Sequence, residues 1–304
     1  MVTVLFVISL LTFLLFEAIP NGDPALRLGG RQATATELHQ IRAAYGFDKP
    51  IYIQYLRTMK NIVTGEAYSY TQGFNVVDEI RAGLPATLSL ALGAGIIWLL
   101  SSIAVGVLAA VKAGKYTDRV LTVLAMTGVS FPPFFLGAVL IYYLGYKANI
   151  FPLGGYVPFT TSPSQWLWHM ILPWFTLSVL FIGFYSRVLR STILDTVNED
   201  YVRTAKAKGL SARQVMFRHT LRNSLIPIMA LWGLDLAQVI GGGAILTESV
   251  YNLHGVGQLA RDAIGRLDII TILAIVMLTA FFVVVIGALV DIAYAFLDPR
   301  IRLS

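Results

Sequence analysis

Six stretches of the chain are long, apolar and almost free of charged side chains. A helix needs about 20 apolar residues to cross the hydrocarbon core of a bilayer. These stretches therefore predict six transmembrane helices, at roughly 1–19, 86–111, 120–146, 168–189, 224–247 and 269–291. Between the third and the fourth, prolines and glycines from 152 to 163 indicate a loop. We expect an all-α integral membrane protein with a sizeable external loop after the first span.

The six spans divide the chain into three expected parts. These are a first transmembrane helix at 1–19, an external domain at 20–85, and a five-helix core at 86–304 with a cytoplasmic loop at 191–223. The external domain is expected to contain short helices near 35–45 and 51–64, and another short external helix is expected at 257–266. We interpret this domain as a structural cap, with a partner-docking surface as the alternative.

Composition supports the membrane assignment. Only 13% of the 304 residues are charged, against ~25% in soluble domains, so the chain cannot supply a soluble globule's charged surface. The composition excludes an ordinary soluble enzyme and a disordered chain. The absence of cysteine excludes a disulfide scaffold.

Lys and Arg are concentrated in alternate loops. Thirteen of them lie in the loops 112–119 and 187–222 and in the C-terminal tail, whereas the opposite short loops hold three. Because short cytoplasmic loops are enriched in Lys and Arg, both termini are expected in the cytoplasm. The first span begins at Met1 without a basic flank, so we expect an N-terminal stub to be missing from this sequence.

The loop 187–222 predicts a helix that ends at a glycine. Asn198 is expected to cap the N-terminus of this helix, and Gly209 to follow its C-terminus. Glu199 and Arg203 are one turn apart, in the order that favours an ion pair.

A second helix is expected directly afterwards. Ser211 and Gln214 have the spacing of a capping box, and the helix that they start runs on into the fifth span. A capped helix in this position suits docking to a cytoplasmic partner. The alternative is a basic anchor that binds anionic lipid headgroups.

The segment Glu199-Asp-Tyr-Val-Arg-Thr-Ala-Lys-Ala-Lys-Gly209-Leu-Ser resembles the coupling loop of ABC importer permeases. The general pattern of that family is E-A-A-x3-G-x9-I-x-L-P. Three residues match it, namely Ala205, Gly209 and Leu221. Four positions depart from it, where Arg203, Thr204, His219 and Arg222 replace the Glu, one Ala, the Ile and the Pro.

The segment is closer to the oligopeptide/dipeptide, binding-protein-dependent branch, whose form is near D-Y-V-R-T-A-x-A-K-G-L…R-H-x-L-R-N-x-L-x-P. Other segments resemble this branch in order along essentially the whole chain. They are Gly22-Asp23-Pro24, Leu84-Pro85-Ala86-Thr87-Leu88, Asp118-Arg119, Gly243-Ala244-Ile245-Leu246-Thr247-Glu248, Gly255-Val256-Gly257 and Leu297-Asp298-Pro299-Arg300. The coupling loop is the most specific of these, and the chain is similar to the first-permease (B-type) subunit.

The resemblance implies a type I ABC importer permease fold and an ATP-driven importer of di- or oligopeptides in a bacterial or archaeal cytoplasmic membrane. It implies no cofactor in this chain, since ATP and Mg would be bound by two cytoplasmic ATPase subunits or domains. The other implied partners are a second, homologous permease, an extracytoplasmic substrate-binding protein and membrane lipid, with no nucleic acid. The implied ATPase-coupling residues are Glu199, Asp200, Tyr201, Arg203, Thr204, Ala205, Lys206, Gly209, Arg218, His219 and Arg222.

Four residues within or beside the spans are candidates for the translocation path. Pro132 and its neighbour Pro133 should break or kink the third span, as packing or as part of the path. Gly242 and Gly243 permit a bend near the outer end of the fifth span, which suits a moving outer gate.

Asp235 is the only full charge deep in a span, so it should face water or a partner. It could contact a cationic substrate group, and a structural pair with the partner subunit or a bound water is the default interpretation. Glu17 and Glu248 lie at span ends and are expected to need no special environment.

Other chemistry has little support in the sequence. There is no G-x4-G-K-[ST] nucleotide motif, and the four histidines lack metal-site spacing, so neither an enzyme nor a metal site is expected. A stand-alone ion-coupled carrier is the alternative, but it would need several intramembrane charges. Within the family, relatives that import nickel chelates or sugars are further alternatives.

Overall fold

The computed structural model describes residues 2–18, 24–30 and 33–297. These residues are almost entirely helical, with one isolated bridge between Tyr68 and Asn75 and no strand within the described ranges. The α-helices are α1 (Val2–Ala18), α2 (Pro24–Gly29), α3 (Ala35–Tyr45), α4 (Ile51–Thr64), α5 (Val76–Val111), α6 (Tyr116–Ser130), α7 (Pro133–Leu140), α8 (Pro163–Thr196), α9 (Asp200–Ala207), α10 (Ala212–Gln214), α11 (Leu221–Gln238), α12 (Ile245–Val250), α13 (Val256–Arg266) and α14 (Ile269–Leu297).

Three π-helical segments interrupt or join these helices, at Ile141–Lys147, Val215–Thr220 and Val239–Gly243. The last two make α10 and α11 parts of one long helix, Ala212–Gly243. The prediction of an all-α membrane protein is confirmed.

The six predicted spans differ in form. Four helices are long and apolar enough to cross a bilayer, at Val76–Val111, Pro163–Thr196, Ala212–Gly243 and Ile269–Val290. The predicted third span is two helices bent by 94° at Pro132, and the first apolar helix is shorter, Thr3–Leu15. Four of the six predicted spans are therefore single long helices, the third is a bent pair of helices, and the first is a shorter apolar helix.

The second span begins ten residues before the predicted start. The Asn75 side chain accepts hydrogen bonds from the backbone N–H groups of Val77 (2.9 Å) and Asp78 (3.2 Å), which caps α5 there. Pro85 lies inside the helix. The predicted boundary followed the charge-free apolar stretch, whereas the Asn75 cap, ahead of the charged first turn, determines where the helix starts.

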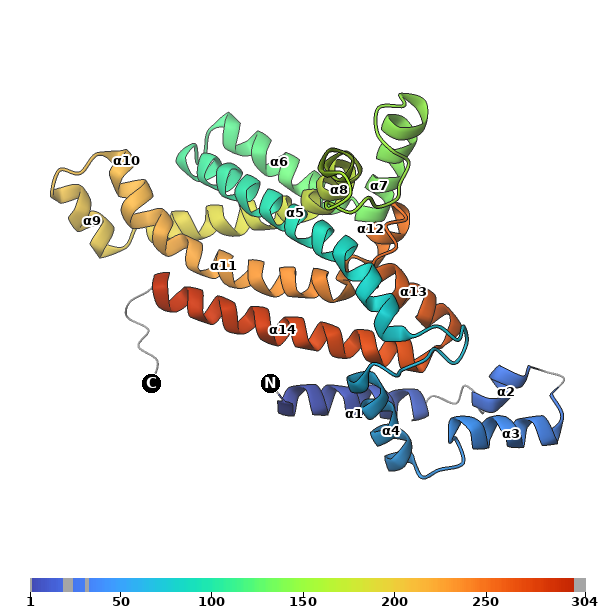
Figure 1. The fold of residues 1–304 in the computed structure, drawn as a ribbon. Helices are drawn as coiled ribbons and strands as arrows, with labels where there is room; N and C mark the ends of the chain where they lie inside the picture. Colours follow the sequence, from blue (N-terminus) through green and yellow to red (C-terminus); the bar gives the residue numbers. More distant parts are fainter. Residues whose placement is uncertain (1, 19–23, 31–32, 298–304) are drawn as a thin grey trace.

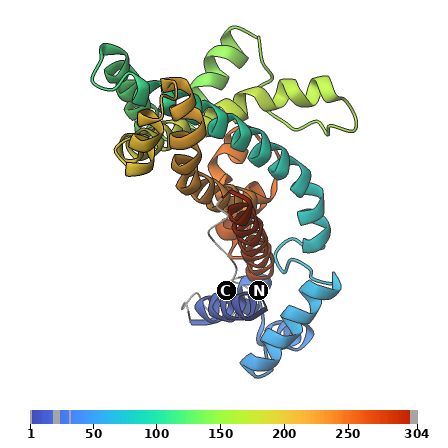
Figure 2. The same ribbon diagram turned by 90° about the vertical axis from the view of Figure 1, so that its left-hand side faces the viewer.

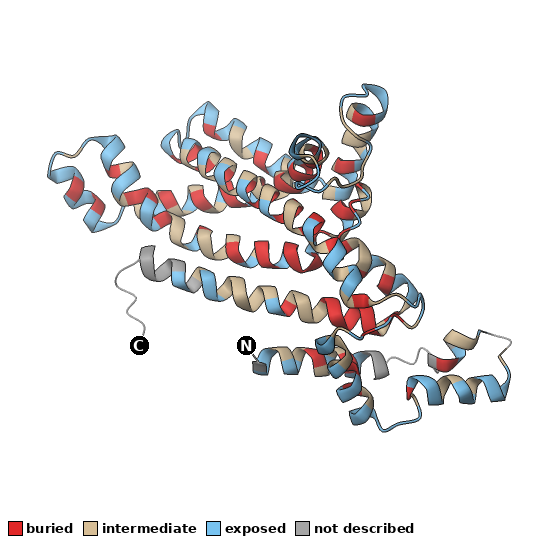
Figure 3. Cartoon of the chain, viewed as in Figure 1, coloured by how far each residue is buried: buried red, intermediate tan, exposed pale blue. Residues whose placement is uncertain are grey.

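The main core lies between α5, α8 and α11. Trp98 stacks on Phe181 with ring centroids 4.3 Å apart, and Trp174 packs against Gly93. The Trp174 indole N–H donates to the Ser89 carbonyl at 2.8 Å. Figure 3 shows the buried residues along the facing sides of these helices and at the N-terminal end of α14.

The helix ends separate into two groups. α9 and α10 lie at one end of the long helices, the end toward which α14 runs (Figure 1). The short helices α2, α3 and α13 lie at the opposite end (Figure 1). In the view turned by 90°, the blue N-terminal helices lie apart from the green and yellow helices (Figure 2). The basic loop 187–222 and the described residues of the predicted external domain 20–85, called the external segment below, therefore lie at opposite ends of the bundle. The end that carries the external segment is called the outer end.

The external segment packs on α1 and α14. Tyr55 of α4 shares a hydrogen bond of 2.7 Å with Ser9 of α1, and the Ser69 hydroxyl donates to Asp268 just before α14. The expected short helices near 35–45 and 51–64 are confirmed as α3 and α4, and the helix expected at 257–266 is confirmed as α13.

Replacing Gly93 with leucine should destabilise the fold. A Cβ at this position would overlap the Trp174 ring, and such overpacking costs about 1–3 kcal/mol. We expect a lower thermal unfolding midpoint in detergent. Gly287→Ala in α14 is the control, since its added Cβ meets no atom within 4 Å, and its midpoint should stay equal or rise. Equal midpoints for Gly93→Leu and the wild type would contradict this packing.

Candidate functional site

Residues 199–222 form a basic hairpin at one end of the bundle (Figure 1). α9 ends at Ala207, and Gly209 has φ of 79°, a left-handed conformation that turns the chain back at little cost for glycine. The backbone N–H of Gln214 donates to the Ser211 hydroxyl at 3.3 Å, and the Ser211 N–H donates to the Gln214 side chain at 3.1 Å. The predicted pair of helices and the capping box are confirmed.

Two details of the prediction are wrong. Asn198 does not cap α9, because its side-chain amide donates back to the Leu194 carbonyl of α8 at 3.1 Å. Glu199 occupies the N-cap position without a side-chain cap bond. Arg203 pairs with Asp200 at 3.7 Å rather than with Glu199, and such an exposed pair contributes little stability.

The hairpin has its own small core. Val202, Ala205 and Val215 are buried together, with Leu210 packed against them. Ala205 therefore joins the two arms and does not face outward. The other predicted coupling residues are exposed except for half-buried His219; the exposed ones are Glu199, Asp200, Tyr201, Arg203, Thr204, Lys206, Gly209, Arg218 and Arg222.

Polar contacts connect the hairpin to the long helices. The Asn223 amide donates to the Tyr201 hydroxyl at 2.7 Å, and the Ser224 hydroxyl donates to Thr196 at the end of α8 at 3.2 Å. Since the second arm is continuous with the long helix Ala212–Gly243, a displacement of α9 must move α11 or break this packing.

An ion pair joins α6 to α8 near the same end. The Arg190 guanidinium donates two hydrogen bonds of 2.7 Å to the Asp118 carboxylate, and the backbone N–H of Gly114 donates to the same carboxylate at 2.9 Å. Asp118 is buried, and the paired geometry is the strong form of a charged hydrogen bond. The sequence analysis counted Arg190 only as a charge of a cytoplasmic loop.

The break in the third span positions α7 beside α12. Pro132 is exposed at the bend, and α7 continues from Pro133 toward the outer end. Gly137 allows close approach, because an added Cβ would lie 3.2 Å from both Tyr251 and Val250. The expected break at the two prolines is confirmed, and the bent span packs against the segment that follows the fifth span.

The fifth span also ends at a break. Gly242 has φ of 105° inside the π-helical segment, a conformation that favours glycine. The Thr279 hydroxyl of α14 donates to the Gly241 carbonyl, and Gly241 and Gly242 are buried while Gly243 is exposed. The predicted bend is confirmed, and in this conformation it is packed against α14.

Asp235 has a partner within the chain. The Tyr185 hydroxyl of α8 donates to the Asp235 carboxylate at 2.6 Å, and Tyr185 is fully buried while Asp235 is half-buried. The structure supplies a tyrosine from the neighbouring helix as one partner, and the expected pairing with a second subunit or a water stays a prediction.

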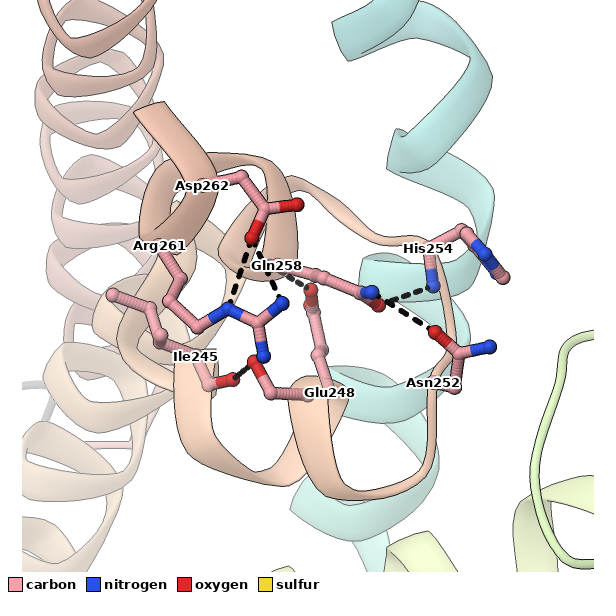
Figure 4. Close-up of polar contacts among 8 residues, drawn as sticks. Ile245, Glu248, Asn252, His254, Gln258, Arg261 and Asp262 are labelled. Atoms are coloured by element: carbon pink, nitrogen blue, oxygen red, sulfur yellow. Dashed lines mark hydrogen bonds and ion pairs between the residues drawn. The ribbon is translucent and has the colours of Figure 1, made fainter. Parts of the chain in front are cut away.

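Glu248 is fully buried, so the expectation that it needs no special environment is wrong. Its carboxylate accepts the Thr87 hydroxyl of α5 at 2.7 Å and the backbone N–H of Gln258 in α13 at 2.9 Å. Thr87 also accepts the Val256 N–H at 2.9 Å. Figure 4 shows Glu248 directed from α12 toward Gln258, whose side chain bonds the Asn252 side chain and the His254 backbone.

This junction joins α5, α12 and α13 at the outer end. Burial raises the pKa of Glu248, and hydrogen bonds from Thr87, Gln258 and Gly257 oppose that rise. A Cβ at Gly255 would collide with the Glu248 carboxylate and the Thr87 hydroxyl. The sequence offered a partial signal for this junction, because the glycines Gly255 and Gly257 follow a few residues after the Glu248 carboxylate at a span end. Nothing in the sequence identified α5 as the third helix of the junction.

Two family descriptions cover nearly all of the chain. Residues 102–303 match the binding-protein-dependent transport system inner membrane component family, and residues 1–91 match the N-terminal region of such membrane components. Over the described residues, no group of three or more His, Asp or Glu side chains could hold a metal ion.

Several relatives match over almost their full length. The chain is 35% identical to the probable peptide ABC transporter permease protein y4tP of Sinorhizobium fredii, covering 99% of this chain and 96% of the relative. It is 34% identical to the oligopeptide transport system permease protein AppB of Bacillus subtilis, with the same coverage. It is 33% identical to the probable D,D-dipeptide transport system permease protein DdpB of Escherichia coli, covering 97% and 92%.

A solved structure supports the fold. The inward-facing MetNI methionine ABC transporter matches with a TM-score of 0.54 and 17% identity, covering 72% of this chain and 96% of that chain. At this identity the likeness concerns the fold alone, and the predicted permease fold is confirmed.

Removing the Glu248 carboxylate should loosen the outer junction. Glu248→Ala leaves the Thr87 hydroxyl and the Gln258 N–H buried without their acceptor, at about 1–3 kcal/mol for each group. We expect a clearly lower thermal midpoint in detergent, with Glu248→Gln between alanine and wild type because it keeps one acceptor oxygen. An alanine variant as stable as the wild type would show that this junction does not hold the helices together.

Proposed function

The chain belongs to the binding-protein-dependent transport system inner membrane component family, and from this membership we propose that it is the permease subunit of an ATP-driven importer of di- or oligopeptides. The peptide assignment rests on relatives named as peptide, oligopeptide and dipeptide permeases along almost the whole chain. The proposed coupling to the ATPase rests on the basic hairpin. This hairpin is a compact unit that is continuous with a transmembrane helix.

The exposed surface of the hairpin is the proposed contact with a cytoplasmic ATPase. Arg203, Lys206 and Arg218 are exposed on it, while Val202 and Ala205 hold its two arms together. Ala205 is thus a positioning residue, and the charged side chains make the contact. Arg190 and Asp118 brace α6 against α8 beside this unit.

Transport follows by alternating access. ATP binding changes the separation of two ATPase subunits, and each basic hairpin follows the subunit that it contacts. The long helix Ala212–Gly243 carries this displacement toward the outer end, where Gly242 supplies the bend. Energy enters as the difference in nucleotide affinity between the two conformations.

The remaining partners follow from the family. A second, homologous permease completes the path, two ATPase subunits bind ATP and Mg, and a substrate-binding protein delivers peptide to the external end. We place the chain in a bacterial or archaeal cytoplasmic membrane with both termini in the cytoplasm, in agreement with its Lys and Arg distribution.

The four residues predicted to belong to the translocation path lie in different environments. Pro132 and Gly243 are exposed at the two breaks and can face the path, whereas Gly242 is buried and acts through the bend itself. Asp235 is the one carboxylate deep in a predicted span, and its hydrogen bond to Tyr185 gives it a structural role. A stand-alone ion-coupled carrier is disfavoured, because one carboxylate bonded in this way offers little for ion coupling.

Gly209→Val should uncouple transport. Valine at φ of 79° is strained, so the turn that aligns α9 with α10 would change. We expect uptake of labelled peptide by the reconstituted importer to fall at least about tenfold, with normal membrane insertion. Gly73→Val is the matched control, since its φ of 73° imposes the same strain in the external segment.

Two results would count against this proposal. One is wild-type uptake by Gly209→Val. The other is uptake by the purified permeases in vesicles that contain no ATPase subunit.

Asp235→Asn should leave uptake within about twofold of wild type. Asparagine keeps an oxygen that accepts the Tyr185 hydroxyl, so the contact between α8 and α11 survives. Asp235→Leu should lower stability, because the buried hydroxyl loses its acceptor. A tenfold loss of affinity in Asp235→Asn at unchanged stability would instead indicate a contact with a cationic substrate group.

A further inference from the structure

A cavity of about 320 Å³ lies in the external segment, apart from the coupling and path residues. Its polar walls come from α4, from the turn after α3 and from residues 66–70, and its floor from Phe13, Ile269 and Ile270 at the outer ends of α1 and α14. This volume is at the lower end of the range for small-molecule sites, about 300–1,000 Å³.

Charges of opposite sign line this cavity. Arg57 and Lys49 supply cations, and Glu66 supplies an anion. Lys49 forms an exposed ion pair with Asp48 at 3.6 Å, whereas among the described residues neither Arg57 nor Glu66 forms an ion pair. The Arg57 guanidinium lies over the backbone of Gly46, where an added Cβ would be 2.7 Å from Nη1. Within the described part of the chain, Arg57 and Glu66 are thus a cation and an anion without an ion-pair partner.

Aromatic rings form a third wall. Tyr45 stacks on Phe47 with centroids 5.8 Å apart, and Tyr70 meets both edge-on, at 4.9 Å and 5.3 Å. Burial raises the pKa of Tyr70, so its phenol stays neutral at physiological pH and can donate a hydrogen bond. This wall offers apolar area beside the charged groups.

The cavity lies on the polar side of α4. Gln54, Arg57 and Asn61 line it, one turn apart along the helix. The most exposed apolar residues of α4 lie on a different side; they are Tyr52, Leu56 and Val63, with exposed fractions of 66%, 62% and 79%, whereas the less exposed Ile53 also lines the cavity. At 3.6 residues per turn, the two sets are roughly opposite, so the apolar side suits lipid and the cavity side suits a water-soluble ligand.

We propose that this cavity binds a short zwitterionic peptide, with its carboxylate at Arg57 and Lys49, its ammonium at Glu66 and an apolar side chain on the aromatic wall. The Glu66 backbone N–H donates to the Asn61 carbonyl at 2.8 Å, so Glu66 lies beside the last turn of α4, about 6 Å along the helix from Arg57 at 1.5 Å per residue. A dipeptide is about 7 Å long, so its two charged ends can reach both side chains. This site is distinct from the path, and its existence does not depend on the proposed transport function.

The test measures binding of the dipeptide Ala-Phe to the purified full-length chain in lipid nanodiscs, by calorimetry. We expect saturable binding to the wild type and at least about tenfold weaker binding to Arg57→Gln and to Glu66→Gln. Ala-Phe amide, which lacks the carboxylate, and N-acetyl-Ala-Phe, which lacks the ammonium, should bind as weakly as the corresponding variants.

Lys60→Gln is the matched control, since Lys60 is an exposed cation of α4 that does not line the cavity, and its affinity should equal that of the wild type. Thermal midpoints of all three variants should match the wild type, because the altered side chains are exposed. Absence of saturable binding to the wild type would overturn the proposal. So would equal affinity of wild type and Arg57→Gln, or an equal loss in Lys60→Gln.

Discussion

A bilayer supplies no water to pair with polar groups, so each carboxylate of this chain that is buried or lies deep in a span must find its hydrogen bonds within the protein. Among the described residues, four such carboxylates accept hydrogen bonds at four junctions between segments, although one oxygen of Asp268 is buried without a partner. Asp118 is bonded by Arg190, Asp235 by Tyr185, Glu248 by Thr87 and Gln258, and Asp268 by Ser69. The bonds join α6 to α8, α8 to α11, α5 to α12 and α13, and the external segment to α14. The arrangement of the helices depends on these few contacts as well as on apolar packing.

The two breaks in the spans are likewise covered by other parts of the protein. The third span bends at Pro132, beside packed α12, and the fifth turns at Gly242, covered by α14. At the opposite end the helix Ala212–Gly243 continues without a break into the basic hairpin. One long element therefore extends from the proposed ATPase contact to the outer bend, which gives a short mechanical route between the two ends.

The sequence alone predicted the helical class, the breaks at Pro132 and near Gly242, and the capping box at Ser211, because apolar length, proline, glycine and cap residues act locally. Contacts between distant segments were not predictable in this way. Nothing in the local sequence pairs Arg190 with Asp118 or Glu248 with Thr87, and the inward position of Ala205 depends on Val215 in the other arm. The start of α5 was missed because the predicted span was limited to the charge-free apolar stretch, whereas the Asn75 cap starts the helix before the charged Asp78 and Glu79.

The central claim is that the basic hairpin contacts the ATPase and moves with it. Because the chain has no cysteine, an environment-sensitive fluorophore can be attached at Lys206→Cys alone, with Lys115→Cys in the other cytoplasmic loop as reference. In the assembled importer, the emission at position 206 should shift when the ATPase subunits are added and shift again with ATP, while position 115 changes less. An emission at position 206 that responds to neither addition would contradict the account.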